Sequence, residues 1–150
     1  FTMSQPFASL LLHGIKTVES RNNDMFASLP AGTKLLLQAG RKDWHDTESY
    51  KEILRTKHDM TNDEIAKLSK LPNKFERGQV LGVVTIGKTT QTASPAERKR
   101  LQRQVVAPTD GIGKFCTEIV DAQWLPKGGI PMRGQPGIYD VHIPKSTLPQ

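Results

Sequence analysis

The chain has 150 residues, of which 36% are hydrophobic and 24% charged, and 21 lysines and arginines outnumber 15 aspartates and glutamates to give a formal net charge of +6. This composition is typical of one globular domain with an ordinary core and excludes a disordered chain. No apolar run approaches the roughly 20 residues that a membrane-spanning helix needs. The single cysteine, Cys116, excludes an internal disulfide or a cysteine zinc cluster.

The charge and the lone cysteine also indicate the setting. An excess of basic residues favours a polyanionic partner, most often nucleic acid, and a lone cysteine suits a reducing compartment, the cytoplasm or the nucleus. We expect Cys116 to pack as a small hydrophobe, because it lies in a strand-like run. The four histidines lack the spacing of metal ligands, so we predict neither a metal nor a cofactor. Because the sequence begins with Phe1 rather than methionine, we expect a trimmed terminus or a domain cut from a longer chain.

Along the chain, the first helix is predicted over residues 6–13, because Phe7, Leu10 and Leu11 repeat at the spacing of one helix face. Gly14 can end this helix, since a glycine adopts the left-handed conformation without penalty. Period-two alternation predicts a short strand over residues 16–21. The elements expected after it are a buried strand over 33–39, helices over 46–57 and 61–70, a strand over 79–87, a basic helix from 94, and strands over 115–120 and 138–143.

Local signals support several of these elements. Capping boxes, in which a hydroxyl and a carboxylate satisfy opposite free amides, are predicted at residues 61–64 and 94–97. Gly82 within its strand indicates a bulge or the close approach of another group to the backbone. Short strands that alternate with helices, closed by the strand near the C-terminus, favour an α+β class built on a mixed β-barrel.

A cation, a carboxylate and a guanidinium follow the first helix closely as Lys16, Glu19 and Arg21. This grouping is typical of a small polar site, although exposed charges on an edge strand or a structural ion-pair network give the same pattern. Strict alternation places Thr17, Glu19 and Arg21 on one face and Lys16 on the other. Contact between Lys16 and Glu19 therefore needs a bulge or a turn.

Residues 1–8, Phe-Thr-Met-Ser-Gln-Pro-Phe-Ala, and residues 14–21, Gly-Ile-Lys-Thr-Val-Glu-Ser-Arg, together resemble the signature of the ASCH domain family. Within that family the chain is most similar to the EOLA group, and next to the C-terminal domain of the activating signal cointegrator. Weaker similarities at residues 41–44, 60–61, 78–82 and 138–144 extend the resemblance over nearly the whole chain. It implies a single ASCH domain over residues 1–150, a PUA-like mixed β-barrel with flanking helices.

The resemblance also implies a function, because PUA-like domains are generally associated with RNA or modified nucleotides. The residue types suit a base-reading pocket: a glutamate accepts from an exocyclic amine, lysine and arginine donate, and a glutamine does both. We therefore expect an RNA-binding domain, with DNA as a further candidate ligand. Its cleft should accept a flipped or terminal nucleotide and be lined by Gln5, Lys16, Thr17, Glu19 and Arg21.

Two further segments are candidates for nucleic-acid contacts. In residues 38–45, Arg41 and Lys42 are expected to hold phosphate, and Trp44 either stacks on a base or anchors the following helix. The Gly/Pro-rich loop over 127–137 adds the cations Lys127 and Arg133, either as RNA contacts or as part of an ordinary connection.

Two alternative functions stay open, and with them the question of whether the chain is an enzyme. In some bacterial ASCH proteins a lysine, a threonine and a glutamate are taken to hydrolyse the acetyl amide of N4-acetylcytidine, with the threonine three residues after the lysine. Here Glu19 occupies that position. A nucleoside or RNA amidohydrolase would use Lys16 as base, Thr17 as nucleophile and Glu19 as acid. The second alternative is a protein-interaction module in transcription coactivation.

Overall fold

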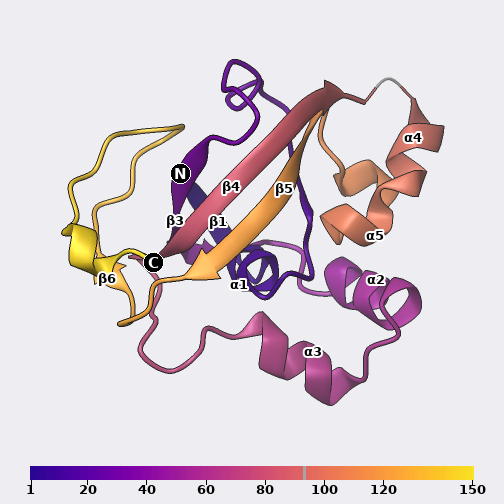
Figure 1. Cartoon of the computed structure of the whole chain (residues 1–150). Helices are drawn as coiled ribbons and strands as arrows, with labels where there is room; N and C mark the ends of the chain where they lie inside the picture. The colour runs from indigo at the N-terminus through magenta and orange to yellow at the C-terminus, as the bar shows by residue number, and fades with distance from the viewer. Residues whose placement is uncertain (93) are drawn as a thin grey trace.

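A curled, mixed half-barrel sheet forms the centre of the computed structural model, which describes residues 1–92 and 94–150 (Figure 1). The strands lie in the order β1-β3-β4-β5-β2, and β6 pairs with β4. Among the described residues, β1 and β3 pair in parallel, and the other strand pairs are antiparallel. The strand bounds are Thr2–Gln5 (β1), Val18–Arg21 (β2), Lys34–Asp43 (β3), Gln79–Gln91 (β4), Phe115–Trp124 (β5) and Ile130–Pro131 (β6). The predicted α+β class is confirmed.

Helix α1 (Phe7–Leu12) lies between the sheet and helices α2 and α3. Its Leu11 packs with the sheet residues, whereas Leu10 packs against α2 and α3, and both are fully buried. Gly14 has a φ of +78° just after the helix, as predicted. The remaining helices are α2 (Ser49–Lys57), α3 (Asn62–Ser69), α4 (Pro95–Arg100), α5 (Gln102–Val105) and the short 3-10 turns Thr109–Gly111 and Lys145–Thr147.

Hydrogen bonds between nearby side chains and backbone amides determine where several helices begin. Thr61 and Glu64 form the predicted capping box before α3, with reciprocal hydrogen bonds of 3.2 and 3.1 Å. Ser94 Oγ accepts from the Glu97 amide at 3.3 Å before α4. Helix α2 begins at Ser49, three residues later than predicted, because the Asp46 carboxylate accepts from the backbone amides that follow it and forms a turn instead.

Gly82 lies where both β5 and α1 approach β4 closely. A Cβ at this position would lie 2.3 Å from the Gln123 carbonyl oxygen of β5 and 2.6 Å from Leu12 Cδ2 of α1. The pairing of β3 with β4 also shifts register next to it, between Leu37 and Gln38. The predicted bulge and the predicted close approach are therefore both present.

The predicted strand over residues 138–143 is wrong. The segment forms no strand, and Ile138 is 39% exposed. It touches the sheet through a side chain: the Tyr139 hydroxyl donates to Gln38 Oε1 and lies 3.2 Å from Thr2 Oγ1. Alternating residues form a strand only where a sheet edge offers its backbone groups, and here β6 takes the place on β4. The sheet therefore remains a half-barrel that no C-terminal strand closes.

Cys116 lies in the core, as predicted. It is 3% exposed and packs with Val18, Val105 and Ile112, and burial raises the pKa of its thiol. A raised pKa keeps the less reactive thiol form at neutral pH. In residues 1–92 and 94–150, no helix is both long and apolar enough to cross a membrane.

Candidate functional site

A cleft of about 600 Å³ lies at the open seam of the half-barrel, between the edge strands β1 and β2. Its walls are completed by residues 44–46, by Ser49 at the start of α2, and by the segment over residues 105–113. The Arg21 guanidinium of β2 donates to the Thr2 carbonyl of β1 at 2.9 Å and so links the two edges. The volume lies within the range of about 300–1,000 Å³ that is usual for small-molecule sites.

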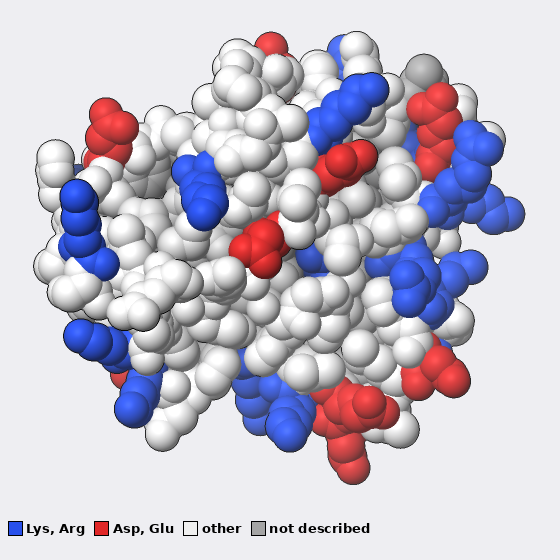
Figure 2. Space-filling model, viewed as in Figure 1, with Lys and Arg blue, Asp and Glu red and all other residues white. Residues whose placement is uncertain are grey.

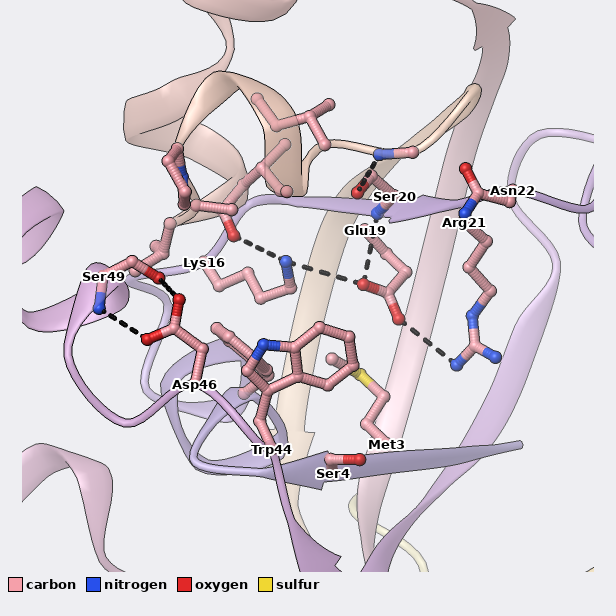
Figure 3. Close-up of a pocket in the computed structure, with 18 of the residues that line it drawn as sticks. Met3, Ser4, Lys16, Glu19, Ser20, Arg21, Asn22, Trp44, Asp46 and Ser49 are labelled. Atoms are coloured by element: carbon pink, nitrogen blue, oxygen red, sulfur yellow. Dashed lines mark hydrogen bonds and ion pairs between the residues drawn. The ribbon is translucent and has the colours of Figure 1, made fainter.

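Lys16, Glu19 and Arg21 form a connected ion network on one side of this cleft (Figure 3). Lys16 Nζ lies 3.5 Å from Glu19 Oε1, and Arg21 Nη2 lies 3.2 Å from Glu19 Oε2. Strand β2 begins only at Val18, so Lys16 precedes it and is not bound by the alternation of its residues. Lys16 lies in the irregular segment before β2, so the contact does not arise from a bulge within that strand. With two cations and one carboxylate, the network carries one net positive charge.

Lys16 is the most deeply buried charge of the network, with 4% of its side chain exposed. Its Nζ also donates to the Val105 carbonyl at 2.6 Å and lies 5.3 Å from the centre of the Phe7 ring. Burial lowers the pKa of Lys16, and the neighbouring Glu19 opposes that change. An ammonium has three donor hydrogens. The Val105 carbonyl and the Glu19 carboxylate take two of them, so one remains for a ligand.

Glu19 holds the two cations in place. Its Oε1 also accepts from the Ser20 amide at 3.2 Å, so three donors converge on one carboxylate whose side chain is 9% exposed. A carboxylate offers about four acceptor positions, which leaves Glu19 little capacity for an additional donor. The cleft therefore presents more donors than acceptors to a ligand.

Trp44 forms the opposite wall. Figure 3 places its indole across the cleft from Lys16 and Glu19, and 40% of the residue is exposed. The Phe7 ring packs edge-to-face with the indole, with ring centres 5.8 Å apart, and the centre of the His45 ring lies 4.6 Å from that of Trp44 in a tilted arrangement. Trp44 is thus positioned by the core and still offers ring surface to a ligand.

The structure separates the other predicted site residues from this cleft. Gln5 is buried and ties α1 to α3: its Oε1 accepts from Ser9 N at 3.0 Å, and its Nε2 donates to Ser69 O at 3.4 Å. Thr17 is exposed and does not line the cleft. Four cations lie elsewhere: Arg41 and Arg133 line a second groove, and Lys42 and Lys127 are exposed outside both cavities.

The loop over residues 105–113 belongs to the site although sequence reasoning missed it. Val106 is buried there in the left-handed region, with φ +59° and ψ +50°, an outlier for a β-branched residue. Gly113 packs on β2 so closely that a Cβ would lie 2.6 Å from the Arg21 carbonyl carbon. The glycines at 111 and 113 were the available signal for this close approach.

The part of the chain that the structure describes contains no group of three or more His, Cys, Asp or Glu side chains placed to hold a metal ion. No model of a known protein family matches the sequence.

The buried charge of Lys16 leads to a prediction about pH. The pKa of Lys16 in the folded protein is below its ordinary value of 10.5, so between those two values the unfolded chain binds more protons and stability rises with pH. We expect the free energy of unfolding of the wild type to rise relative to that of Lys16→Met as pH increases toward 10.5. Urea unfolding from neutral to alkaline pH measures this difference, and both proteins keep the Cys116 thiol. A difference that stays constant with pH would contradict the prediction.

Proposed function

We propose that this chain is an ASCH-type, PUA-like domain that binds RNA and takes one flipped or terminal nucleotide into the cleft between β1 and β2. The observation that carries the proposal is the buried Lys16–Glu19–Arg21 network on one side of a cleft, opposite the exposed ring of Trp44. A base stacks on an aromatic face while donors of the network contact its oxygen atoms.

The charge of the cleft supports a ligand rich in acceptors. Lys16 and Arg21 together exceed the single charge of Glu19, whose oxygens already accept from three donors. Base carbonyls and phosphate oxygens are the acceptors that a nucleotide supplies. The proposed specificity therefore favours contact with a base carbonyl over the exocyclic amine that the sequence alone suggested.

The surface charge supports a polyanionic partner. Figure 2 shows Lys and Arg side chains gathered over α4 and α5, which contain Arg98, Lys99, Arg100 and Arg103. Such a surface attracts RNA without reading its sequence, and the attraction weakens as salt concentration rises. Sequence-independent attraction and the cleft thus have separate roles in the proposed complex.

Replacing Trp44 tests the proposal. Base–aromatic stacking contributes about 1–3 kcal/mol, so we expect Trp44→Ala to weaken binding of a single-stranded RNA of about eight nucleotides by roughly 5- to 150-fold. Fluorescence anisotropy with labelled RNA at two salt concentrations measures this. Val120→Ala is the matched control, because Val120 is 65% exposed on β5 and does not line the cleft. Equal affinity for the wild type and Trp44→Ala would overturn the proposal for the cleft.

A second candidate function rests on the lowered pKa of Lys16 beside Glu19, which suits proton transfer. In an amidohydrolase, neutral Lys16 takes a proton from water as the water oxygen bonds to the acetyl carbon of N4-acetylcytidine. The protonated lysine returns that proton to N4 as the C–N bond breaks, giving cytidine and acetic acid, which then releases its own proton to water to become acetate. Water is the nucleophile in this scheme, because Thr17 lies outside the cleft.

Turnover separates the two functions. Release of cytidine from N4-acetylcytidine by the wild type, lost in Lys16→Met, would establish the hydrolase. RNA binding that depends on Trp44 without such release would leave nucleotide binding as the function. A protein-interaction module, the third class, predicts neither result.

A further inference from the structure

A second groove, of about 560 Å³, adjoins β1. It is formed by the last part of β3, by Gly78 and by the residues that follow β6, and Thr2 lines both this groove and the cleft. Arg41 and Arg133 are its two charged residues, and none of the residues that line it is acidic. The two arginines are 92 positions apart in sequence, and the fold brings them to one cavity.

Hydrogen bonds hold together the two segments that carry these arginines. The buried Gln38 donates from Nε2 to the Gly78 carbonyl at 3.1 Å and to the Met132 carbonyl at 2.5 Å, which joins the segments that carry Arg41 and Arg133. The Met132 amide also donates to Gly78 at 3.2 Å. The groove is therefore held by hydrogen bonds between segments and is not a chance gap between loops.

Gly78 sets the position of the Arg41 side chain. It has a φ of +80°, and a Cβ here would lie 3.1 Å from Arg41 Cζ and 3.2 Å from Nη2. The guanidinium therefore lies directly against the glycine backbone, where a side chain would displace it. A positioned guanidinium is suited to contact a phosphate through two parallel hydrogen bonds.

The two guanidinium groups have no ion pair or hydrogen bond with another residue in the described part of the chain. Four other arginines differ in this respect: Arg21 pairs with Glu19, Arg55 with Glu52 and Arg77 with Asp43, and Arg103 donates to the Lys57 carbonyl. Two unneutralised cations in a groove without a carboxylate are complementary to an anion. The ligand of this groove is therefore expected to carry negative charge.

We propose that the second groove holds backbone phosphates of the same RNA strand whose nucleotide enters the cleft, with the strand crossing β1 at Thr2. This inference rests on the proposed function. It separates the interface into a cleft that holds one nucleotide and a neighbouring groove that holds only phosphates. A single nucleotide then needs the cleft alone, whereas an oligonucleotide uses both.

The test compares ligands of different length on two charge-matched variants. Arg41→Gln/Arg133→Gln removes both cations of the groove, and Lys34→Gln/Lys67→Gln removes two exposed cations elsewhere. The probes are the four ribonucleoside 5′-monophosphates and a labelled random-sequence RNA of about eight nucleotides. For the arginine variant we expect unchanged binding of the monophosphate that the wild type binds. For its RNA binding, the slope of log affinity against log salt concentration should be less steep by about 1.4, or about 0.7 for each lost phosphate contact.

The outcomes distinguish a failure of the second groove from a failure of the proposed RNA-binding function. Equal losses of RNA affinity and equal salt slopes in the two variants would overturn the second groove and leave the cleft intact. Loss of monophosphate binding in the arginine variant would also overturn it, because the groove would then be part of the nucleotide site. A wild type that binds neither RNA nor any monophosphate would overturn the proposed function itself.

Discussion

Gly82→Ala is expected to destabilise the protein by about 3 kcal/mol or more, at the upper end of the range for overpacked cores. The added Cβ would lie 2.3 Å from the Gln123 carbonyl oxygen and 2.6 Å from Leu12 Cδ2. The carbonyl belongs to the β5 backbone, so it cannot rotate away as a flexible side chain would. We therefore expect β4 and β5 to separate at the centre of the sheet, and the Leu12 side chain of α1 has to move as well.

Gly40→Ala is the matched control, because Gly40 also lies within a strand of the sheet, β3. A Cβ at Gly40 would have its nearest neighbour, the Met3 carbonyl oxygen, at 3.4 Å. We expect a change within about 1 kcal/mol for this variant, since an alanine that fits also reduces the freedom of the unfolded chain. Urea unfolding of both variants measures the difference. Equal midpoints would show that the sheet accommodates the added methyl group at Gly82.

Sequence reasoning succeeded where the determining interactions are local. The capping box at Thr61 and Glu64 joins residues three positions apart, and the buried stripe with Leu10 and Leu11 follows from helix geometry alone. Gly82 was also informative, because a glycine inside an otherwise apolar strand has few explanations. These features need no knowledge of the rest of the chain.

The strand predicted over residues 138–143 failed for the complementary reason. Its alternating pattern is compatible with a strand, but pairing depends on a sheet edge provided by residues far away in sequence. In the structure β6 pairs with β4, and Tyr139 contacts Gln38 through its side chain. Alternation does not indicate whether such an edge is available.

The candidate site shows the same division. The grouping of Lys16, Glu19 and Arg21 in one polar site was predicted from their closeness in sequence, although strict alternation placed Lys16 on the opposite face. The hydrogen bond from Lys16 to the Val105 carbonyl joins residues 89 positions apart. The role of Gln5 was also hidden, because a glutamine at a helix start can bond to the helix backbone or to a ligand, and here it bonds to Ser9. Only the fold decides between such partners.

Glu19→Ala is expected to cost about 3–5 kcal/mol in the free energy of unfolding, the usual effect of removing one partner from a buried ion pair. The carboxylate is the only acidic group in the network, and its loss leaves the buried Lys16 ammonium with the Val105 carbonyl and the Arg21 guanidinium with the Thr2 carbonyl. Lys16→Met should change stability by about 1 kcal/mol or less, because Glu19 keeps Arg21 as a partner and the methionine fills a similar volume.

The double variant Lys16→Met/Glu19→Ala separates this account from a simple loss of packing. If unpaired buried charge causes the instability, removing Lys16 as well should restore part of what Glu19→Ala loses, so the double variant should be more stable than the single one. Urea unfolding of the four proteins measures this coupling, and additive losses would contradict it. Since RNA binding is proposed to need the donors of Lys16, the more stable double variant should still bind RNA more weakly than the wild type. Recovered stability without recovered affinity would assign the network a function beyond holding β1 and β2 together.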